Sequence, residues 1–186
     1  MIFKKKKKLY VVGNKASKSL SPTIFNYWFK KYNIKARYGY LELTEKNFHK
    51  KIKEVLEKKD TLGLNVTIPF KNKIIKHLGK IDTHAKKIGA VNCVTNKKTI
   101  NGTNTDWTGY YKTLPSIKKT KNRKVIILGY GGASHAIHYV LKKRGFKDIL
   151  IFNRSKKKIK YSKKTEYTKK YSDLETHLEG VFLIIN

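Results

Sequence analysis

The residues with the clearest potential for chemistry lie in one short stretch, residues 65–71, which reads Asn-Val-Thr-Ile-Pro-Phe-Lys. Side chains alternate along a strand, so Asn65 and Thr67 are predicted to point to the same face of a sheet. Pro69 is typical of the first turn of a helix, where its missing N–H is not needed. This arrangement would bring an amide, a hydroxyl and the Lys71 ammonium together at one sheet edge. Two hydrogen-bonding groups beside a proton donor suit a polyhydroxylated substrate with a reacting carbonyl group.

Two serines form a second candidate group. Ser19 and Ser21 lie between the end of a predicted strand and the start of a predicted helix. Hydroxyl groups beside the N–H groups of a helix N-terminus could bind a carboxylate or a phosphate. Capping of the helix by one serine explains the same pattern, and taken alone it is the simpler explanation.

Three further residues need an interpretation. Asn92 is the one polar residue in an apolar run, and Asp106 stands at the start of a predicted helix. Asp106 could cap that helix, or it could pair with Lys71 and hold the ammonium against a substrate. Cys93, the only cysteine, is predicted to be a buried small residue without a chemical role, and a single cysteine excludes an intrachain disulfide. We predict no metal site.

A glycine-rich turn at residues 129–134 follows an apolar run typical of a buried strand and precedes a helical pattern. Dinucleotides are bound in this context: Gly129 would allow the turn, and Gly131 would let the backbone approach a pyrophosphate at the helix N-terminus. Ser134 replaces the third glycine of the usual motif and is still small enough for close helix–sheet packing. An ordinary strand-to-helix turn is the alternative, and the position of the turn favours cofactor binding.

The end of the next predicted strand favours NADP over NAD. An NAD site usually has an acidic residue about 20 residues after the glycines, where it holds the ribose. Here the strand ends in Asn153, Arg154 and Ser155, with lysines at 156–158. No carboxylate would repel a 2′-phosphate, and the guanidinium could clamp one. Only four residues of the chain are arginines, which argues against a chance surface position for Arg154.

The elements that must position these residues alternate between strand and helix. Apolar periodicity predicts, in the first part of the chain, strands at 9–13, 36–43, 62–67, 90–95 and 98–102 and helices at 20–31, 48–56, 69–78 and 83–88. A connecting helix at 106–114 and a lysine-rich linker at 115–122 are followed by strands at 124–128, 148–152 and 181–186 and by a helix at 133–144. This order predicts an α/β fold with a mainly parallel first sheet. The predicted domains are a substrate-binding and catalytic domain at 1–114 and a partial Rossmann domain at 123–186.

Charge is high, but its distribution argues against nucleic acid as a partner. The 186 residues carry a formal net charge of +32, and the lysines are spread through nearly every segment. Recognition of bases and phosphates relies on the rigid arginine fork, and arginine is scarce here. No apolar run approaches the ~20 residues of a membrane helix, and no signal peptide is visible. We expect a lysine-coated cytoplasmic protein without a membrane or nucleic-acid partner, either a monomer or a homodimer.

Taken together, the motifs resemble those of the shikimate dehydrogenase family. The matching segments occur in the family's order at residues 19–22, 65–71, 89–92, 104–106, 129–133 and 153–155, the last of which is similar to the family's Asn-Arg-Thr motif. The resemblance covers essentially the whole chain. Six ordered motifs are far more specific than any one of them.

The resemblance implies reversible reduction of 3-dehydroshikimate to shikimate by NADPH, a step toward the aromatic amino acids. Lys71 would be the acid–base residue and Asp106 its partner. An ammonium can stabilise and protonate the oxygen that gains negative charge, and either Lys71 or Asp106 could accept the proton in the reverse direction. The substrate carboxylate would be bound by Ser19 and Ser21, and its hydroxyls by Asn65, Thr67, Asn92 and Asp106. NADP(H) would be bound by Gly129, Gly131, Gly132, Ala133, Asn153, Arg154, Ser155 and Lys158.

The sequence also departs from the family. Phe25 stands where the family usually has His, which would affect packing. Tyr130 replaces a small residue in the glycine turn and His135 stands where Arg or Lys is common, and both would weaken cofactor binding. The family continues beyond the strand at 181–186, so we expect a fragment of a longer product or an impaired truncated protein, with an unpaired apolar edge at that strand.

Two other functions compete with this interpretation. A quinate/shikimate-type paralogue with relaxed cofactor choice is disfavoured by Asn153 and Arg154. A non-catalytic basic binding module left from a degenerated enzyme is disfavoured by the presence of Lys71, Asp106 and both serines.

Overall fold

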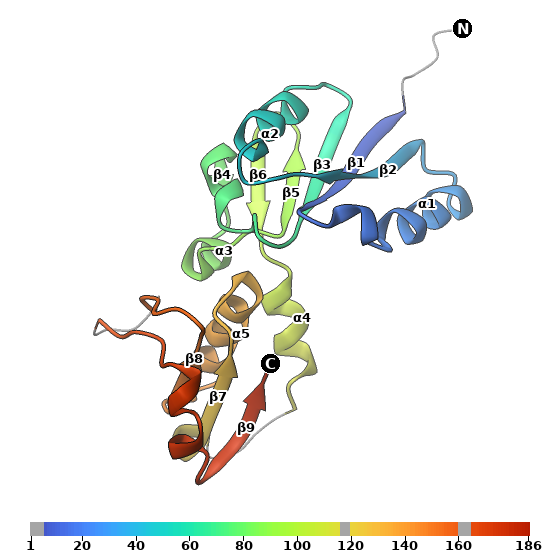
Figure 1. Cartoon of the computed structure of the whole chain (residues 1–186). Coiled ribbons are helices and arrows are strands. Elements are labelled where there is room, and N and C mark those ends of the chain that lie inside the picture. The colour runs from blue at the N-terminus through green and yellow to red at the C-terminus, as the bar shows by residue number, and fades with distance from the viewer. Residues whose placement is uncertain (1–5, 116–119, 160–164) are drawn as a thin grey trace, which may run out of the picture. The chain divides into compact units, whose positions relative to one another are not determined.

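The structure is a computed structural model that describes residues 6–115, 120–159 and 165–186. The chain forms two compact units (Figure 1). The first comprises the chain up to Lys86 together with Ala90–Asn104, and the second comprises Lys87–Gly89 together with Thr105–Asn186. The boundary at Asn104 and Thr105 assigns the predicted connecting helix to the second unit.

The first unit is built on a mixed sheet. Its strands lie in the order β2-β1-β3-β5-β6-β4. Pairing is parallel between β1 and β2, β1 and β3, and β4 and β6, and antiparallel between β3 and β5 and between β5 and β6. The bounds are β1 (Lys7–Gly13), β2 (Ala36–Glu42), β3 (Thr61–Val66), β4 (Lys80–Ile81), β5 (Cys93–Asn96) and β6 (Ile100–Thr103). The predicted α/β fold is confirmed, with parallel pairing in β2-β1-β3 and between β4 and β6.

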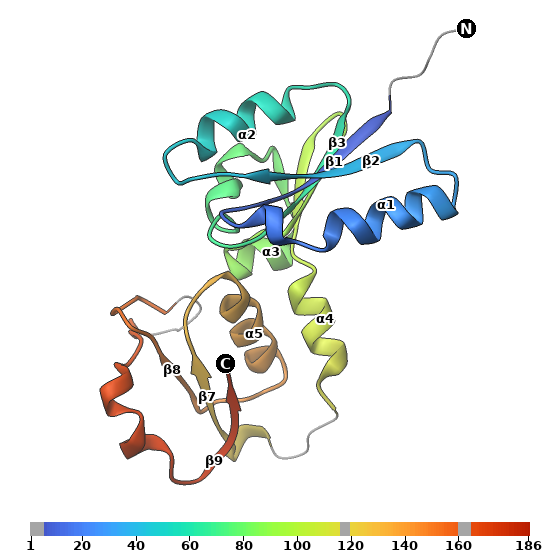
Figure 2. The same ribbon diagram turned by 45° about the vertical axis from the view of Figure 1, so that its right-hand side comes forward.

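Helices cover both faces of this sheet, as Figures 1 and 2 show. Alternation along β1 sends Val11 to the side of α1 (Ser21–Lys31), where Phe25 and Phe29 pack. It sends Val12 to the opposite side, into the main core. There the helix predicted at 48–56 is confirmed as α2 (Phe48–Leu56), which buries one apolar stripe that consists of Phe48, Ile52, Val55 and Leu56.

The predicted helix at 69–78 is wrong. Residues 69–72 form turns, and only the short 3₁₀-helix η2 (Lys73–His77) follows. The Phe70 N–H donates to Thr67 O at 2.9 Å, which closes a tight turn where a helix was expected. Phe70 is fully buried and stacks on Phe48 with ring centroids 4.2 Å apart. Burial of this ring, which the local sequence pattern does not reveal, overrides the helical signal of the proline. The helix predicted at 83–88 is confirmed as α3 (Thr83–Ile88).

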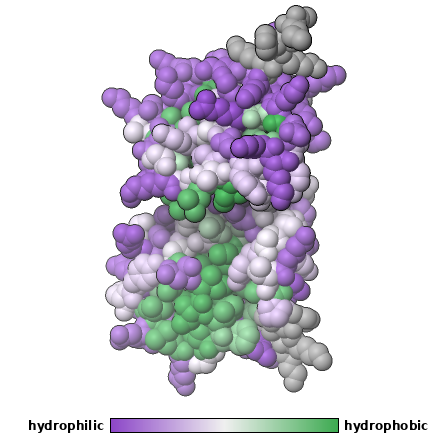
Figure 3. Space-filling model, turned by 90° about the vertical axis from the view of Figure 1, so that its right-hand side faces the viewer, coloured by the Kyte–Doolittle hydropathy of each residue, from purple (hydrophilic) through white to green (hydrophobic). Residues whose placement is uncertain are grey.

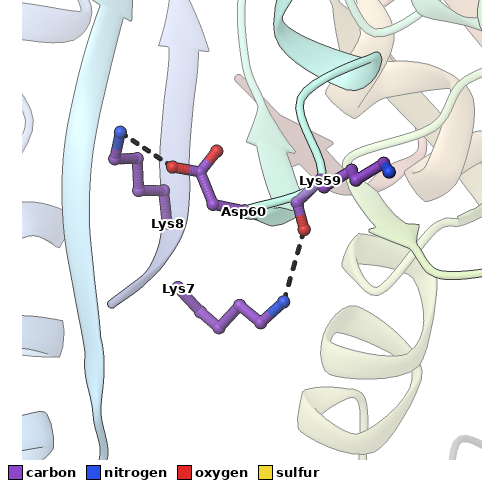
Figure 4. Close-up of polar contacts among 4 residues, drawn as sticks. All are labelled: Lys7, Lys8, Lys59 and Asp60. Atoms are coloured by element: carbon purple, nitrogen blue, oxygen red, sulfur yellow. Dashed lines mark hydrogen bonds and ion pairs between the residues drawn. The ribbon is translucent and has the colours of Figure 1, made fainter. Parts of the chain in front are cut away.

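The N-terminal end of β1 is tied to the loop before β3 (Figure 4). Lys8 Nζ lies 3.0 Å from Asp60 Oδ2, and Lys7 Nζ donates to Lys59 O at 3.3 Å. The hydrogen bond to Asp60, and then its charge, raise the pKa of Lys8. Lys8 N also donates to Asp60 O at 2.8 Å. These contacts fix the start of the strand whose far end leads to the candidate site.

The second unit has a three-stranded parallel sheet in the order β8-β7-β9. Its strands are β7 (Lys124–Leu128), β8 (Ile149–Phe152) and β9 (Val181–Ile185), and its longer helices are α4 (Asp106–Thr113) and α5 (Gly132–Lys143). The helices pack through Trp107 and Tyr139, whose centroids are 5.9 Å apart. Arg144 lies over the Tyr111 ring at 3.9 Å and donates to Tyr111 O at 2.8 Å. Short 3₁₀ turns lie at Thr120–Asn122, Tyr171–Asp173 and Glu175–His177.

The outer strand of this sheet, β9, exposes apolar side chains. Among the residues of the two sheets that can be described, β9 pairs with β7 alone. Phe182 is 41% exposed and Ile184 is 49% exposed. Figure 3 shows a broad hydrophobic area on the second unit, in the lower half of the view. Over the described ranges, no helix has the length and apolar character needed to cross a membrane.

Candidate functional site

The first cluster of predicted site residues lies where the parallel strands β1 and β3 end. The Thr67 N–H donates to Val12 O at 2.8 Å, and the Asn14 N–H donates to Ile68 O at 3.1 Å. A Cβ on Gly13 would lie only 2.5 Å from Thr67 Cγ2. Glycine is therefore required at position 13 for Thr67 to approach β1 this closely. Sequence reasoning did not single out Gly13.

Backbone hydrogen bonds bring Lys71 and Asn92 to the same place. The Val91 N–H donates to Lys71 O, and the Val66 N–H donates to Asn92 O, both at 2.8 Å. The half-buried Lys71 and Asn92 therefore flank the end of β3, next to Thr67. These bonds bring the backbones of Thr67, Lys71 and Asn92 close together, although Pro69 does not begin a helix. The predicted grouping of the Asn65, Thr67 and Lys71 side chains around a substrate stays a prediction.

Asn65 lies on the face of the sheet that α1 covers. It alternates with the buried Leu64 and Val66, which belong to the main core on the opposite face. The Tyr38 hydroxyl donates to Asn65 Oδ1 at 2.6 Å. Cys93 is the partner of Asn65 in the β3–β5 register and is half-buried, not fully buried as predicted.

The two serines are joined to each other. Ser19 Oγ accepts a hydrogen bond from the Ser21 N–H at 3.2 Å and donates to Ser21 Oγ at 3.1 Å. Leu20 occupies the N-cap position of α1 and provides no capping side chain. Ser19 thus binds one first-turn N–H, as the capping explanation requires, and also gathers the two hydroxyls at the helix start. Both residues are half-buried.

The loop that carries the serines is anchored to β2. The 3₁₀-helix η1 (Ala16–Lys18) precedes Ser19. The Ser17 N–H donates to Glu42 Oε2 at 3.0 Å, and the Ser17 hydroxyl donates to the same oxygen. The hydroxyl bond, and then the N–H bond, lower the pKa of Glu42. A carboxylate at the end of β2 therefore holds the turn that leads to the serine pair.

Asp106 belongs to the second unit, whereas Lys71 belongs to the first. It is the first residue of α4, and Thr105 occupies the N-cap position without a side-chain capping bond. Asp106 thus places an acidic group in the first helical turn, where the helix dipole favours it. Its pairing with Lys71 stays a prediction.

The glycine turn has the conformation that its sequence predicts. Gly129 has a φ of +92°, which favours glycine, and its N–H donates to Phe152 O at 2.7 Å. Gly131 is the N-cap residue of α5 and has no side chain that could cap the helix. A Cβ at Gly129 or Gly131 would meet nothing within 4 Å, so the outer side of the turn is open. Gly132 and Ala133 begin α5.

Asn153 connects the glycine turn to the end of β8. Its Oδ1 accepts the Tyr130 N–H at 3.1 Å, and its Nδ2 donates to Ser155 O at 2.8 Å. Arg154, Ser155 and Lys158 are exposed on the segment that follows. The predicted cofactor residues therefore lie on two neighbouring segments, which one amide side chain fixes relative to each other.

The two residues expected to disturb this turn are both buried. Tyr130 is 4% exposed and belongs to the core of the second unit, and His135 is 5% exposed. Their ring centroids are 4.4 Å apart. The Tyr130 side chain is thus directed into the core, whereas its backbone N–H belongs to the turn. Whether these departures weaken cofactor binding stays a prediction. Phe25, the third departure, stacks on Tyr38 with centroids 4.6 Å apart.

Comparisons of the sequence and of the structure with known proteins all find shikimate dehydrogenases. Residues 11–94 match the family model described as shikimate dehydrogenase substrate binding domain. The chain is 38% identical over 160 residues to a shikimate dehydrogenase (NADP(+)) of Clostridium botulinum, which covers 84% of this chain and 62% of that protein. The crystal structure of shikimate dehydrogenase 1 from Peptoclostridium difficile is 30% identical, with a TM-score of 0.77, over 95% of this chain and 65% of that one.

A third relative was solved with ligands. The shikimate 5-dehydrogenase of Listeria monocytogenes, in complex with shikimate and NAD, is 32% identical with a TM-score of 0.65 and covers 81% of this chain and 52% of that one. The chain thus spans between 52% and 65% of the length of these three proteins.

Fold and site together define a two-unit α/β protein whose second unit contains a Rossmann-type strand, glycine turn and helix, from β7 to α5. The family model matches the first unit, and the matches to the relatives extend over both units, which narrows the class of protein. The chain is similar to shikimate dehydrogenases in both units, and its residues 11–94 match the substrate-binding domain of that family.

Proposed function

We propose that this protein catalyses the reversible NADPH-dependent reduction of 3-dehydroshikimate to shikimate. The observation that carries the proposal is the cluster at the ends of β1 and β3, where Thr67, Lys71 and Asn92 are held together by backbone hydrogen bonds. The names and complexes of the relatives, which include shikimate and nicotinamide dinucleotides, support the same conclusion.

The first unit would bind the substrate. We assign its carboxylate to Ser19 and Ser21, whose hydroxyls are gathered at the start of α1, where the helix dipole favours an anion. We assign its hydroxyl groups to Asn65, Thr67 and Asn92, with Asp106 as a further acceptor. An amide or hydroxyl that binds a substrate hydroxyl rejects analogues without it, because a buried polar group would then be unpaired.

Lys71 would handle the proton. As negative charge develops on the carbonyl oxygen of the substrate, an adjacent ammonium can stabilise it and then donate the proton. Its half-buried position beside Thr67 and Asn92 suits this role, because partial exclusion of water strengthens the interaction of the ammonium with the oxygen. We propose Asp106 as the partner of Lys71, and either residue could accept the proton during oxidation of shikimate.

The second unit fits a dinucleotide phosphate. The open outer side of the turn at Gly129 and Gly131, together with the N-terminal N–H groups of α5, can hold a pyrophosphate. Gly132 and Ala133 lie at the same helix start. Arg154 can bind a 2′-phosphate, supported by Asn153, Ser155 and Lys158. NADPH, when bound, supplies the hydride.

The test is the initial rate of NADPH oxidation with 3-dehydroshikimate. We expect Lys71→Ala to lower kcat by about 10²- to 10⁴-fold, the usual contribution of a general acid–base group. The control is Lys76→Ala, which removes an exposed lysine from η2 and is expected to keep the rate. Full activity of Lys71→Ala would contradict the assignment of the proton donor.

Cofactor choice has its own test. If Arg154 binds the 2′-phosphate, Arg154→Ser raises the KM for NADPH about tenfold or more and leaves the KM for NADH nearly unchanged, since only NADPH has that group. An equal effect on both cofactors would contradict the role of Arg154 and would revive the paralogue with relaxed cofactor choice.

We further propose that the protein works in the cytoplasm without a nucleic-acid partner. Dispersed lysines give weak, non-specific attraction to phosphates, which falls steeply with salt. Nucleic-acid affinity that persists at physiological salt and tracks sequence would contradict this part of the proposal.

A further inference from the structure

A buried tyrosine holds the amide of Asn65. The Tyr38 hydroxyl donates to Asn65 Oδ1 over 2.6 Å, a short hydrogen bond between side chains 27 positions apart. Tyr38 lies on β2 opposite Leu9 of β1, and Asn65 lies on β3 opposite Val11. The tyrosine therefore reaches across the central strand on the face that α1 covers.

Tyr38 is itself held by two residues of α1, Phe25 and Asn26. It is 2% exposed, and its ring stacks on Phe25 of α1 with centroids 4.6 Å apart and planes 7° from parallel. The side chain of Asn26 binds its backbone twice, since Asn26 Nδ2 donates to Tyr38 O at 2.8 Å and Asn26 Oδ1 accepts the Tyr38 N–H at 2.9 Å. The hydroxyl is thus presented to Asn65 by a rigid assembly.

The direction of this hydrogen bond decides what Asn65 can do. Burial, and then the nearby Cys93, raise the pKa of the Tyr38 phenol, so the hydroxyl keeps the proton that it donates to Asn65 Oδ1. A donor must meet the carbonyl end of the amide. The two N–H donors of the Asn65 amide are then left for an acceptor such as a hydroxyl oxygen. Without the tyrosine hydroxyl, the amide could turn either end toward a ligand.

We propose that Tyr38 is a positioning residue that fixes the orientation of the Asn65 amide for binding of a substrate hydroxyl. The inference rests on the proposed function, because Asn65 is assigned there to the substrate. It extends that function in one respect: the same tyrosine packs on α1, which begins at Ser21. Tyr38 therefore joins the helix that begins at the second serine, Ser21, to the amide that would bind a hydroxyl at the other end of the substrate.

The experiment compares Tyr38→Phe with Tyr40→Phe in the full chain. Tyr38→Phe removes only the hydroxyl and keeps the ring that stacks on Phe25. Tyr40 lies two residues along the same strand and is 53% exposed, so Tyr40→Phe is a matched control. The first readout is the pair of Asn65 side-chain N–H resonances in a nitrogen–proton correlation spectrum, assigned with Asn65→Ala. The second is the dissociation constant for shikimate.

Tyr38→Phe is expected to shift the Asn65 side-chain resonances and to weaken shikimate binding about tenfold, the usual effect of removing one well-placed buried hydrogen bond. Tyr40→Phe is expected to do neither. In the Asn65→Ala background, Tyr38→Phe should have no further effect on binding, because the two residues act as a unit. A merely structural role of Tyr38 would instead give an equal loss in both backgrounds.

The outcomes separate the inference from the function on which it rests. If the unaltered chain binds shikimate and Tyr38→Phe leaves both readouts unchanged, the inference is overturned and the proposed function stands. If the Asn65 resonances shift and the unaltered chain binds no shikimate, the hydrogen bond is real and the proposed function is contradicted, together with the role of Tyr38 in binding.

Discussion

The two units of this protein differ in how their sheets are covered. In the first unit, apolar side chains from both faces of the sheet are buried, by α1 on one side and by α2 and η2 on the other. In the second unit, the outer strand β9 leaves Phe182 and Ile184 almost half exposed. The first unit therefore has the rigid base that a substrate site needs, whereas covering the apolar surface of β9 would still stabilise the second unit.

The polar residues of the two units differ in the same way. In the first unit, Thr67, Lys71 and Asn92 are held by main-chain hydrogen bonds of the sheet region, and Asn65 is held by a buried tyrosine. In the second unit, Arg154 and Lys158 are exposed, and side-chain hydrogen bonds of Asn153 and Lys157 help to link their segment to the glycine turn. Substrate recognition is therefore expected to tolerate surface changes better than cofactor recognition.

Removal of a core ring should show this contrast most strongly. Phe70 is fully buried against Phe48, so Phe70→Ala is expected to lower the free energy of unfolding of the first unit by about 3–5 kcal/mol. Phe182→Ala, at a ring that is 41% exposed on β9, should cost the second unit only about 1 kcal/mol. Each unit has one tryptophan, Trp28 or Trp107, so denaturant unfolding of single-tryptophan variants separates the two. Equal losses would contradict the difference in packing.

Acid should weaken the second unit through His138. Burial, and then the charge of Lys142, lower the pKa of this histidine from 6.5 to about 4. Above pH 6.5 the histidine is neutral in both the folded and the unfolded state. Between pH 6.5 and 4 the unfolded chain binds a proton that the folded unit does not, so the free energy of unfolding falls by up to about 3 kcal/mol.

Denaturant titrations followed through Trp107 at pH 7 and at pH 4.5 measure this loss. His138→Leu should remove most of the pH dependence. Lys142→Gln should reduce it by a smaller amount, because burial is the larger cause of the lowered pKa. A pH dependence that survives His138→Leu unchanged would assign the acid sensitivity to other groups.

The smallest expected effect on stability concerns the exposed edge. Ile184→Lys places a charge on β9 at a side chain that is 49% exposed, and it should change the free energy of unfolding by roughly 0.5 kcal/mol or less. It should nevertheless lower the binding of a hydrophobic dye and the tendency to self-associate. Ile34→Lys is the matched control in the first unit, since Ile34 is also 49% exposed. Equal changes in dye binding would show that β9 is not a special surface.

Much of this architecture could be predicted from the sequence, because local patterns determined it. The stripe of α2 and the strand, glycine turn and helix around Gly129 depend on periodicity and turn chemistry, which short windows contain. The helix expected after Pro69 failed because Phe70 is drawn into the core by contacts distant in the sequence. The sheet was predicted as mainly parallel, whereas the return through β5 and β6 is antiparallel, and strand-sized apolar runs do not encode direction.

The sequence allows candidate site residues to be proposed, but it does not reveal the contacts that hold them in place. Lys71, Thr67 and the serines are visible as polar residues at strand and helix ends. Tyr38 was missed because a buried tyrosine in a strand looks like an ordinary core aromatic until its hydroxyl partner is known. Gly13 was missed because its close approach to Thr67 brings together two residues that are 54 positions apart in the sequence.

We propose that the first unit holds the shikimate site, and Cys93 offers a direct test. It is the only thiol in the chain, it is half-buried, and it lies opposite Asn65 in the sheet register. The measurement is the rate of alkylation of Cys93 by a small maleimide with and without shikimate, with a variant that carries Ser19→Ala and Ser21→Ala as the control. Shikimate at ten times its dissociation constant should slow alkylation about tenfold in the unaltered chain, and the same concentration should slow it much less in the control. An alkylation rate that saturating shikimate leaves unchanged would contradict the account.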